Sequence, residues 1–323
     1  MPGRRSSARE GAPRRVCRDI RMTGSTPRVS VVVPVFQGER VIGDCLVSVL
    51  GQTFPHDQYE IVVVNNGSTD RTGALVEGFP VRVVEEPRLG VAFARNRGVE
   101  AARGELVAFT DADCLAEPTW LAALVAHFDA HVQLAGVGGH LPGYDPRTPV
   151  QYYIPDRRLL SQERALGGER GYAPFLITAN ALLVRRLIVE VGGFDTAFAT
   201  NSEDADLCWR IGDLGYGFGF APEAVVWHRH RGTLRALCRW MFRYGRESAY
   251  LLKKHRHRCG IRWVHFDWPH YGQWLLAIGR FCQPWPLRAP VWERRFAGYD
   301  ILRSACYTAG RVVGSIENRA IIL

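Results

Sequence analysis

The sequence predicts an α/β protein with a mostly parallel sheet, helices on both faces of that sheet, and a helical extension at the C-terminus. Between residues 29 and 138, short apolar runs of strand length alternate with stretches whose apolar residues recur at helical spacing. Segments rich in Gly, Asn and Asp follow several of these runs directly. Because parallel sheets bind ligands beyond the carboxyl ends of their strands, these segments form the expected site.

The expected elements follow one another along the chain. Val29-Ser-Val-Val-Val33 is a buried-strand run closed by Pro34, and apolar residues at six positions between 41 and 50 form one face of a helix over 39–50. Asp70 is placed to cap the next helix, and Pro118 opens a later one, since proline is tolerated in a first helical turn. The further strands are expected at 59–64, 81–84, 106–110 and 134–138, and the further helices at 71–78, 90–102 and 118–130.

Composition excludes several classes of protein. Of the 323 residues, 47% are hydrophobic, which excludes a largely disordered chain. No apolar stretch approaches the roughly 18 residues needed to span a bilayer, and no apolar core follows the basic N-terminus, so neither a membrane span nor a secretory signal is expected. The eight cysteines are widely separated, with no C-x-x-C pair, which favours reduced thiols in a cytoplasmic protein.

The net charge of +9 is unevenly distributed. Residues 1–28 carry eight arginines and two acidic residues, and residues 229–262 carry eleven basic residues and only Glu247. The rest of the chain is therefore acidic overall. This distribution argues against a nucleic-acid binder, whose basic surface would belong to the fold itself. It suits an acidic body that handles metal, with basic appendages that meet an anionic surface or acceptor, and residues 1–27 are expected to be a disordered basic tail.

The strongest local motif is Asp111-Ala-Asp113, which directly follows the apolar run Leu106–Phe109. Two carboxylates one residue apart at a strand end can face one ligand, and they suit a hard divalent cation that keeps open positions for phosphate oxygens. The alternative is an acidic turn or a helix cap. The position at a strand's carboxyl end favours the cation site.

Three further motifs each have a structural and a functional interpretation. Asn65–Asp70 makes a good turn after a strand and carries no function by itself. The carboxylates at 203, 204 and 206 either cap a helix or include a catalytic base whose pKa is set by crowding and burial. His228 is either a structural histidine or a third metal ligand.

Taken together and in order, the motifs resemble those of the family-2 glycosyltransferases of the GT-A fold. The resemblance covers roughly residues 28–245 and rests on the spacing of the whole set. The matching motifs are Val32-Val-Pro34-Val-Phe36, Gln52-Thr53, Val64–Asp70, Gly90–Arg97, Asp111-Ala-Asp113, Gly192-Gly-Phe-Asp195, Glu203-Asp204 and His228. The fold implied is GT-A, a Rossmann-like arrangement over residues 28–230, with residues 231–323 as the helical extension.

The resemblance also implies roles for individual residues. Asn66 stands where the family often has an Asp that touches the nucleobase. The expected metal residues are Asp111, Asp113 and His228, with Asp113 the direct ligand of the D-x-D pair and His228 the late ligand. Asp204 is expected to be the catalytic base, with Glu203 as the competing carboxylate. The residues expected to bind or border the nucleotide are Pro34, Val35, Phe36, Glu39, Asn66, Arg88, Gly90, Asn96 and Asp111.

The activity implied is the metal-dependent, inverting transfer of a sugar from a nucleoside diphosphate sugar to an acceptor hydroxyl, with Mg²⁺ or Mn²⁺ as cofactor. The acceptor is expected to be a saccharide or a lipid-linked saccharide, bound by residues 140–180, where Tyr144, Tyr152, Tyr153 and Tyr172 either stack on sugar rings or pack beneath a loop. Nucleic acid is not an expected partner.

Three other functions compete with this one. A phosphatase of the haloacid dehalogenase type also has a D-x-D motif after a strand, but its motif usually opens the domain, whereas about eighty ordered residues are expected before Asp111 here. A nicotinamide dehydrogenase needs G-x-G-x-x-G after its first strand, and this chain has Pro34-Val-Phe-Gln-Gly-Glu39 instead. The third alternative is a catalytically inactive nucleotide-sugar-binding scaffold.

The segment 231–258 is the one feature that the resemblance does not explain. Its arginines recur at steps of four and three residues, which predicts a basic stripe along a helix over 231–254. The stripe is either solvated, or it docks on an anionic membrane surface and makes the protein peripheral to the cytoplasmic membrane face, or it grips an anionic acceptor or the diphosphate. The arginines of the stripe are Arg231, Arg235, Arg239, Arg243 and Arg246.

Overall fold

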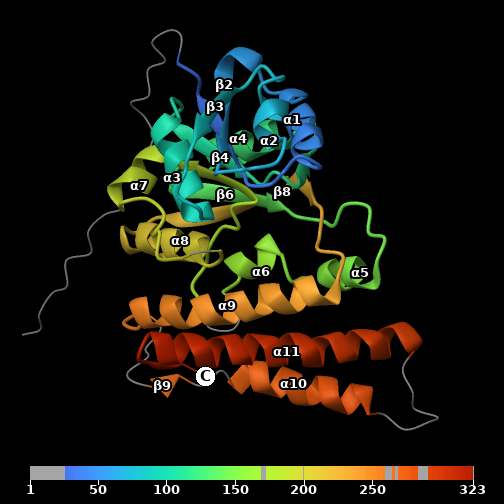
Figure 1. Cartoon of the computed structure of the whole chain (residues 1–323). Coiled ribbons are helices and arrows are strands. Elements are labelled where there is room, and N and C mark those ends of the chain that lie inside the picture. The colour runs from blue at the N-terminus through green and yellow to red at the C-terminus, as the bar shows by residue number, and fades with distance from the viewer. Residues whose placement is uncertain are drawn as a thin grey trace, which may run out of the picture.

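The computed structural model describes residues 26–168, 172–198, 200–258, 264–265, 268–282 and 290–322. The predicted N-terminal tail lies almost entirely outside these ranges. The described chain forms an eight-stranded mixed sheet with helices on both faces and a layer of long helices on one side (Figure 1). This arrangement confirms the predicted α/β class and the helical extension.

The strands of the main sheet lie in the order β3-β2-β1-β4-β7-β6-β8-β5. β1, β2, β3 and β4 are parallel to one another, as predicted, whereas β7 runs antiparallel to both β4 and β6. The strand bounds are β1 Val29–Val35, β2 Tyr59–Asn65, β3 Arg82–Glu85, β4 Leu106–Thr110, β5 Cys114–Ala116, β6 Leu134–His140, β7 Asn180–Val184 and β8 Gly217–His228. A separate pair is formed by β9 Val264–His265 and β10 Ile321–Ile322.

The helices of the body connect these strands and bury one apolar face each against the sheet. Their bounds are α1 Ile42–Leu50, η1 His56–Gln58, α2 Thr72–Val76, α3 Val91–Ala101, α4 Trp120–Ala130, α5 Pro149–Asp156, α6 Gln162–Leu166, α7 Arg185–Glu190 and α8 Glu203–Asp213. The buried core between them is dominated by Val, Leu and Ile from β1, β2, β4 and β7. Such runs are typical of strands covered on both faces.

The loop after β1 explains why α1 begins three residues later than predicted. The backbone N–H of Gly38 donates to Thr72 Oγ1 at 2.8 Å, and that of Glu39 donates to Asp70 Oδ2 at 3.2 Å. These bonds hold residues 38–39 against the loop after β2, so they cannot enter the helix. The predicted capping role of Asp70 is wrong, because Arg71 is the N-cap of α2 and no side chain caps this helix. Asp70 lies one residue earlier, and its Oδ1 accepts from the backbone N–H of Thr72 at 3.0 Å, which shapes the turn before the helix.

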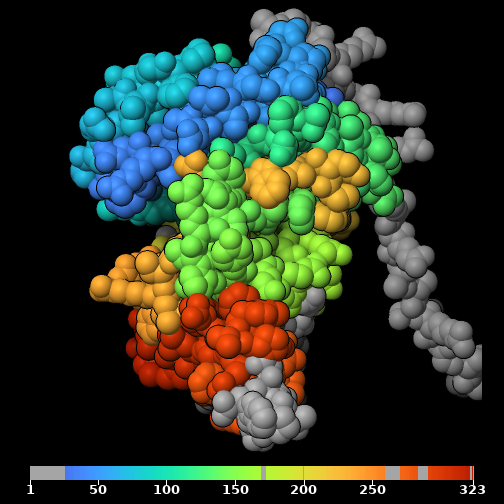
Figure 2. Space-filling view, turned by 90° about the vertical axis from the view of Figure 1, so that its right-hand side faces the viewer, coloured from blue at the N-terminus to red at the C-terminus, as the bar shows by residue number. Residues whose placement is uncertain are grey.

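Three long helices form a layer beneath the body. Their bounds are α9 Leu234–Lys254, α10 Trp268–Phe281 and α11 Val291–Glu317. α11 lies between α9 and α10, and α9 faces the body (Figure 1). Figure 2 shows the same order from the side, with the green segment around α5 and α6 between the blue body and the red helices. Among the described residues, no helix combines the length and the apolar character that a membrane crossing requires.

Glycines let α9 and α11 approach until their backbones touch. A Cβ atom on Gly245 would lie 2.0 Å from the Tyr307 carbonyl oxygen, and one on Gly310 would lie 2.0 Å from that of Phe242. Real Cβ atoms do not reach such separations, so only glycine fits at these crossings. The two helices therefore pack as one unit.

The predicted basic helix is shorter than expected at its start. α9 begins at Leu234, because Thr233 caps it by accepting from the backbone N–H of Ala236 at 3.2 Å. Arg231 therefore precedes the helix, and its assignment to the helical stripe is wrong. The other four arginines of the predicted stripe are exposed: Arg235, Arg239, Arg243 and Arg246.

Candidate active site

The D-x-D turn lies at the carboxyl end of β4, on the edge where the parallel strands end. The backbone N–H of Cys114 donates to the Asp111 carbonyl at 3.0 Å, which closes the turn between β4 and β5. The Asp113 side chain is the more open of the two, at 44% exposed against 30% for Asp111. The turn thus presents Asp113 to the ligand side.

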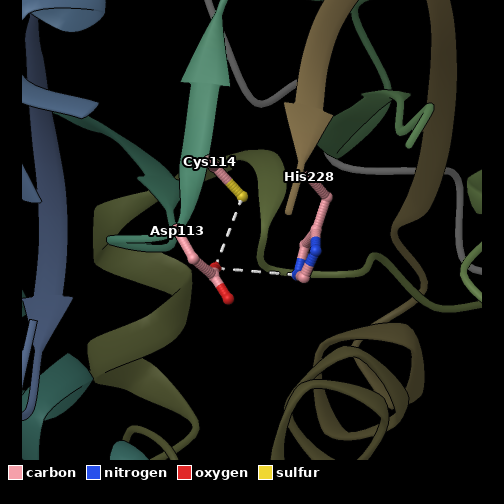
Figure 3. A group of neighbouring side chains, drawn as sticks. All are labelled: Asp113, Cys114 and His228. Atoms are coloured by element: carbon pink, nitrogen blue, oxygen red, sulfur yellow. Dashed lines mark hydrogen bonds and ion pairs between the residues drawn. The ribbon is translucent and has the colours of Figure 1, made fainter. Parts of the chain in front are cut away.

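A three-residue strand brings His228 to this turn. β5 pairs antiparallel with the end of β8, and the register sets Cys114 opposite His228. As a result, His228 Nε2 lies 3.7 Å from Asp113 Oδ1, although the two residues are far apart in the sequence. Figure 3 shows the imidazole and the carboxylate facing one another across the space between β5 and β8.

The donors at this point fit a divalent cation. Ligands about 2.1 Å from one ion can lie up to roughly 4 Å apart, so Asp113 and His228 can bind the same ion. The thiol of Cys114 lies close to both, at 3.9 Å from Asp113 Oδ1, but burial raises its pKa well above the usual value and keeps it protonated. Nδ1 of His228 is buried without a hydrogen-bond partner in the described residues. The carboxylate suits Mg²⁺ or Mn²⁺, and the imidazole suits a transition-metal ion, so the pair favours Mn²⁺ over Mg²⁺, with positions left for phosphate oxygens.

Stacking holds the His228 ring in place. Its centroid lies 5.0 Å from that of His230, with the two planes 25° apart. Burial, with the neighbouring His228, lowers the pKa of His230 to about 3. His230 therefore stays neutral and serves as a packing surface for the His228 ring rather than as a second charge.

Arg95 connects the D-x-D turn to the other acidic motif, and sequence reasoning missed it. Its guanidinium donates to Asp111 Oδ1 at 2.9 Å and to Glu203 Oε1, and both Arg95 and Glu203 are buried. Burial opposes the charged form, but the two carboxylates outweigh it, so the pKa of Arg95 is raised. Position 95 falls on the inward face of α3 together with Ala92 and Val99. A buried arginine on an apolar face requires acidic partners, and that was the available signal.

The first turn of α8 places Asp204 and Glu203 in different environments. Glu203 is paired with Arg95, whereas Asp204 lines the cavity described below and accepts from the backbone N–H of Ala205 at 2.8 Å. Burial, with the adjacent Glu203, raises the pKa of Asp204 to about 7. A carboxylate that titrates near neutral pH is suited to take a proton and later release it. Ser202, just before the helix, has φ +65, a conformation that non-glycine residues adopt only under constraint.

The residues predicted at the end of β1 are divided between core and surface. Val35 is buried, and its carbonyl accepts from the backbone N–H of Asn66 at 2.8 Å. Phe36 is exposed, Pro34 is half-buried, and Glu39 accepts from the backbone N–H of Arg71 at 3.2 Å. The side chains of Phe36 and Pro34 are thus the open ones at this strand end.

Asn66 holds the loop that follows β3. Its Nδ2 donates to the carbonyls of Glu86 and Arg88 at 2.8 and 2.7 Å, and its Oδ1 accepts from the backbone N–H of Gly90 at 3.0 Å. The side chain is buried, so the described role is to shape this loop. Contact between Asn66 and a nucleobase stays a prediction.

Arg88 and Asn96 are also engaged with the protein. Arg88 is exposed and forms an ion pair with Glu86 at 2.7 Å, and this hydrogen-bonded arginine lowers the pKa of Glu86 to about 2. Asn96 binds both the N–H and the carbonyl of Phe194, each at 2.8 Å. Asn96 therefore holds α3 against the Gly192–Asp195 segment. A place for Asn96 beside the nucleotide stays a prediction.

A cavity of about 310 Å³ lies between the body and the helical layer, and it is lined by the acidic residues of both motifs and by His228. Its upper wall holds Asp111, Asp113, Glu203, Asp204 and His228, and its lower wall is formed by side chains of α9 and α11. The lower and side walls are rich in aromatic and arginine side chains: Arg158, Arg164, Tyr172, Phe175, Arg231, Trp240, Tyr244, Arg303 and Tyr307.

The four tyrosines predicted to meet the acceptor separate into different roles. Tyr172 lines the cavity, with its hydroxyl 3.3 Å from that of Tyr307. Tyr153 is wholly buried and donates to Asp300 at 2.7 Å, so it packs α5 against α11. Tyr144 lies beneath the Arg229 guanidinium, and Tyr152 is exposed. Packing is the correct interpretation for Tyr153.

Arg231 enters the cavity from the segment between β8 and α9. Its guanidinium lies 4.9 Å from the centre of the Trp240 ring and makes no hydrogen bond or ion pair to any described residue. Asp111 and Asp113 lie within electrostatic range of it. An arginine without an acidic partner, three residues after His228, is a ready site for phosphate oxygens.

The chain is similar to known glycosyltransferases over most of its length. The family profile described as "Glycosyl transferase family 2" matches residues 30–192. The glycosyltransferase AglE of Haloferax volcanii is 30% identical over 236 residues, which is 70% of this chain and 74% of that protein. The probable glycosyltransferase YdaM of Bacillus subtilis is 29% identical over 240 residues, or 71% of this chain and 57% of its own. The chain thus spans little more than half of the latter relative.

Solved structures share the fold. The mannosyltransferase PcManGT from Pyrobaculum calidifontis, in complex with GDP-Man and Mn²⁺, superposes with a TM-score of 0.55 at 22% identity, covering 90% of this chain and 74% of that one. Glucosyl-3-phosphoglycerate synthase from Mycobacterium tuberculosis, with Mn²⁺, UDP-glucose and phosphoglyceric acid, gives 0.54 at 21% identity, covering 75% and 83%. The profile match and the identity to AglE together show that the chain belongs to glycosyl transferase family 2 and is a glycosyltransferase.

Proposed function

We propose that this glycosyltransferase moves a sugar from a nucleoside diphosphate sugar to a hydroxyl of a saccharide or lipid-linked saccharide, with a divalent metal and with inversion at the anomeric carbon. The observation that carries the proposal is the convergence of Asp113, His228 and Asp204 on one cavity. The acceptor oxygen forms a bond to the anomeric carbon as the bond to the diphosphate breaks. The nucleoside diphosphate leaves, and the acceptor proton passes to a base.

Asp113 and His228 are the proposed metal ligands. A Mg²⁺ or Mn²⁺ ion held by these two residues would supply Lewis-acid neutralisation of the leaving diphosphate. Asp111 stays within the Arg95 bridge and orients the turn, with its second oxygen free to meet the nucleotide. The complexes of PcManGT and of glucosyl-3-phosphoglycerate synthase, which share this fold, both contain Mn²⁺, and this supports the assignment.

Asp204 is the proposed general base. Its pKa of about 7 lets it be ionised at neutral pH and still accept a proton from the attacking hydroxyl. Glu203 is bound to Arg95 and is therefore assigned to positioning. Because one displacement inverts the sugar, no covalent nucleophile is needed.

Arg231 is the proposed partner of the leaving diphosphate. It is stacked on Trp240, is not neutralised by an acidic residue, and shares the cavity with Asp113. The lower part of the cavity, with Tyr172, Tyr244 and Tyr307, offers aromatic faces to the acceptor sugar. The nucleotide is proposed to lie at the ends of β1, β2 and β3, between Phe36 and the loop that ends at Gly90.

We also propose that the exposed arginines of α9 attract the protein to anionic lipid headgroups, where a lipid-linked acceptor would be found. Only part of the predicted segment is available for this, because Lys254 and His255 contact Asp206 at 2.6 and 2.8 Å, and Arg258 contacts Asp213. The available residues are Arg235, Arg239 and Arg243. Binding to anionic but not neutral vesicles, lost in the triple Glu variant, tests this point.

A thermal-shift screen of nucleoside diphosphates and their sugars, with and without Mn²⁺, tests the proposed function. We expect stabilisation by one nucleotide that increases with Mn²⁺ and loses this increase in Asp113→Ala. Glu190→Ala, which removes an exposed carboxylate from α7, is the matched control and should behave as the wild type. Metal-dependent binding that survives in Asp113→Ala rules out the metal assignment. Nucleotide binding without turnover on any donor would instead indicate the inactive scaffold.

A further inference from the structure

The outermost helix of the layer exposes large apolar side chains to solvent. On α10, Leu275 is 68% exposed and Leu276 is 63% exposed, while at the start of α11 Val291 reaches 80% and Trp292 reaches 56%. We call this set the outer apolar face. Its members are Leu275, Leu276, Ile278, Phe281, Val291 and Trp292, all of them exposed.

These side chains are concentrated, not scattered. Of the eighteen large apolar side chains exposed in the described residues, nine belong to α10 and α11. The two helices pack side by side, with His270 Nε2 3.1 Å from Thr308 Oγ1 at one end and Phe281 beside Gly298 at the other. Single exposed apolar residues are normal on a soluble protein, but this many on two neighbouring helices point to a contact surface.

The chemistry of this face favours a bilayer surface over a protein partner. α10 contains no Asp, Glu or Lys, and its one arginine, Arg280, is exposed near the C-terminal end of the helix. In the first turns of α11, Glu293 follows Trp292 and is itself followed by Arg294 and Arg295, so this end of the face keeps a net positive charge. Leu, Phe and Trp side chains bordered by arginines match the boundary between acyl chains and anionic headgroups. Because α10 is too short and α11 too polar to cross a membrane, such contact would be confined to one leaflet.

The position of the outer apolar face also allows contact with a membrane. α10 lies on the side of the layer away from the body, with α11 between it and α9 (Figure 1). The lower wall of the active-site cavity is made by α9 and α11. A membrane beneath α10 would therefore lie about two helix diameters from the cavity, roughly 20 Å, without covering the sheet-edge site.

We propose that the outer apolar face inserts into the surface of a phospholipid bilayer containing anionic lipid, as an interfacial anchor that is distinct from the arginines of α9. The two surfaces differ in their response to salt. Attraction between the α9 arginines and headgroups is screened by ions, whereas transfer of apolar side chains out of water is not. The proposal does not depend on the glycosyl-transfer assignment, since it rests on exposed side chains outside the site.

Flotation of the full chain with phosphatidylcholine vesicles containing phosphatidylglycerol tests this proposal, at low salt and in about 0.5 M NaCl. The test variant is Leu275→Gln/Leu276→Gln/Val291→Gln, which changes only side chains that already face solvent. The matched control is Val47→Gln/Val132→Gln/Val189→Gln, three exposed valines of the body. Melting temperature, nucleotide binding and solution mass are measured for every protein.

We expect wild type and control to remain on the vesicles at high salt, and the test variant to lose binding there by about tenfold or more. Three results would overturn the proposal. The wild type could fail to float at either salt concentration. The test variant could float as the wild type does, with binding removed only by changing the α9 arginines. Finally, a wild-type dimer that the test variant converts to a monomer, without vesicle binding, would assign the face to a second copy of the chain.

Discussion

The sheet-edge site and the exposed side of α9 hold their arginines in opposite ways. At the sheet edge, Arg95 is buried and bound to two carboxylates, Asp111 and Glu203. In the layer, Arg235 and Arg239 face solvent, and at the boundary between the regions Arg231 is stacked on Trp240 with no acidic partner among the described residues. Charge at the sheet edge is therefore balanced before any ligand binds, whereas the charges of Arg231 and of these α9 arginines are available to a ligand or a surface.

This difference indicates where each kind of substitution should act. Removing a balanced, buried charge leaves its partner uncompensated in the interior, so both the fold and the geometry of the site are affected. Removing an exposed charge affects only what it meets from outside. The predictions below use substitutions in both regions to test this separation.

The largest effect is expected for Asp204→Asn. The substitution keeps the shape of the side chain and removes the base, so turnover should fall by ~10²–10⁴-fold while donor affinity stays near that of the wild type. In the wild type, activity should rise with pH through about 7 as Asp204 ionises, and the variant should lack this limb. Steady-state rates and donor titrations across pH measure both. If Glu203→Gln were the inactive variant and Asp204→Asn stayed active, the two roles would be exchanged.

The same carboxyl provides a stability readout. Its pKa is raised in the folded state, so folding favours its protonated form, and this stabilisation is lost as pH rises from about 4 toward 7. Asp204→Asn should therefore raise the melting temperature more at pH 8 than at pH 5. A gain that does not change with pH would contradict the assigned environment.

The next effect concerns the balanced arginine. Arg95→Met retains much of the side-chain volume but leaves Asp111 and Glu203 without their cation, so we expect a loss of about 3–5 kcal/mol in the free energy of unfolding. Denaturant unfolding measures it. The double variant Arg95→Met/Glu203→Gln should recover part of the loss, because one uncompensated charge is removed. No recovery would indicate that packing, and not charge, fixes this position.

A smaller effect is expected within the layer. Gly310→Ala places a methyl group against the Phe242 carbonyl, so α9 and α11 must separate, at a cost of about 1–3 kcal/mol. Gly279→Ala in α10 is the control, since nothing lies within 4 Å of its added Cβ. Thermal unfolding compares the two. Equal melting temperatures would show that the close crossing is not a constraint.

The smallest effect is expected for the exposed arginines. Arg235→Gln/Arg239→Gln/Arg243→Gln should change turnover on a soluble acceptor by less than about twofold, since these side chains lie outside the site. Arg231→Gln removes the same kind of charge from inside the cavity and should weaken nucleoside diphosphate binding by about tenfold. Isothermal titration with the nucleotide distinguishes them. Similar losses in both variants would remove the distinction between stripe and cavity.

The parallel half of the sheet could be predicted because each strand is a local apolar run with a helix after it. The pairing of β5 with β8 could not, since three residues carry too little pattern and their partner is over a hundred positions away. The proposed metal ligands Asp113 and His228 were both candidates in the sequence, but their proximity depends on that pairing. The role of Arg95 could in principle have been predicted, because the residue falls on the apolar face of α3.

Arg231 shows that a helical pattern can also mislead. Its spacing to Arg235 fits a helical stripe, but Thr233 starts the helix after it, so periodicity placed the residue on the wrong surface. Likewise, Tyr153 was grouped with candidate acceptor contacts, whereas it lies in the packing between α5 and α11. Periodicity and composition describe what an element contains, and neither identifies which neighbour will meet a given side chain.

The register of β5 against β8 limits where insertions and deletions can be accepted. Side chains alternate along a strand, so a one-residue deletion in β8 before His228 would bring Arg229 to the position opposite Cys114, and a one-residue insertion would bring Trp227 there. Either change would turn the imidazole to the other face. The sheet would still form, but the proposed cation site would lose its nitrogen ligand. Residues 229–233 lie beyond the strand, so a change of length there does not alter the register that orients the imidazole. Homologues and engineered variants should therefore differ in length after position 230 far more readily than between 217 and 228.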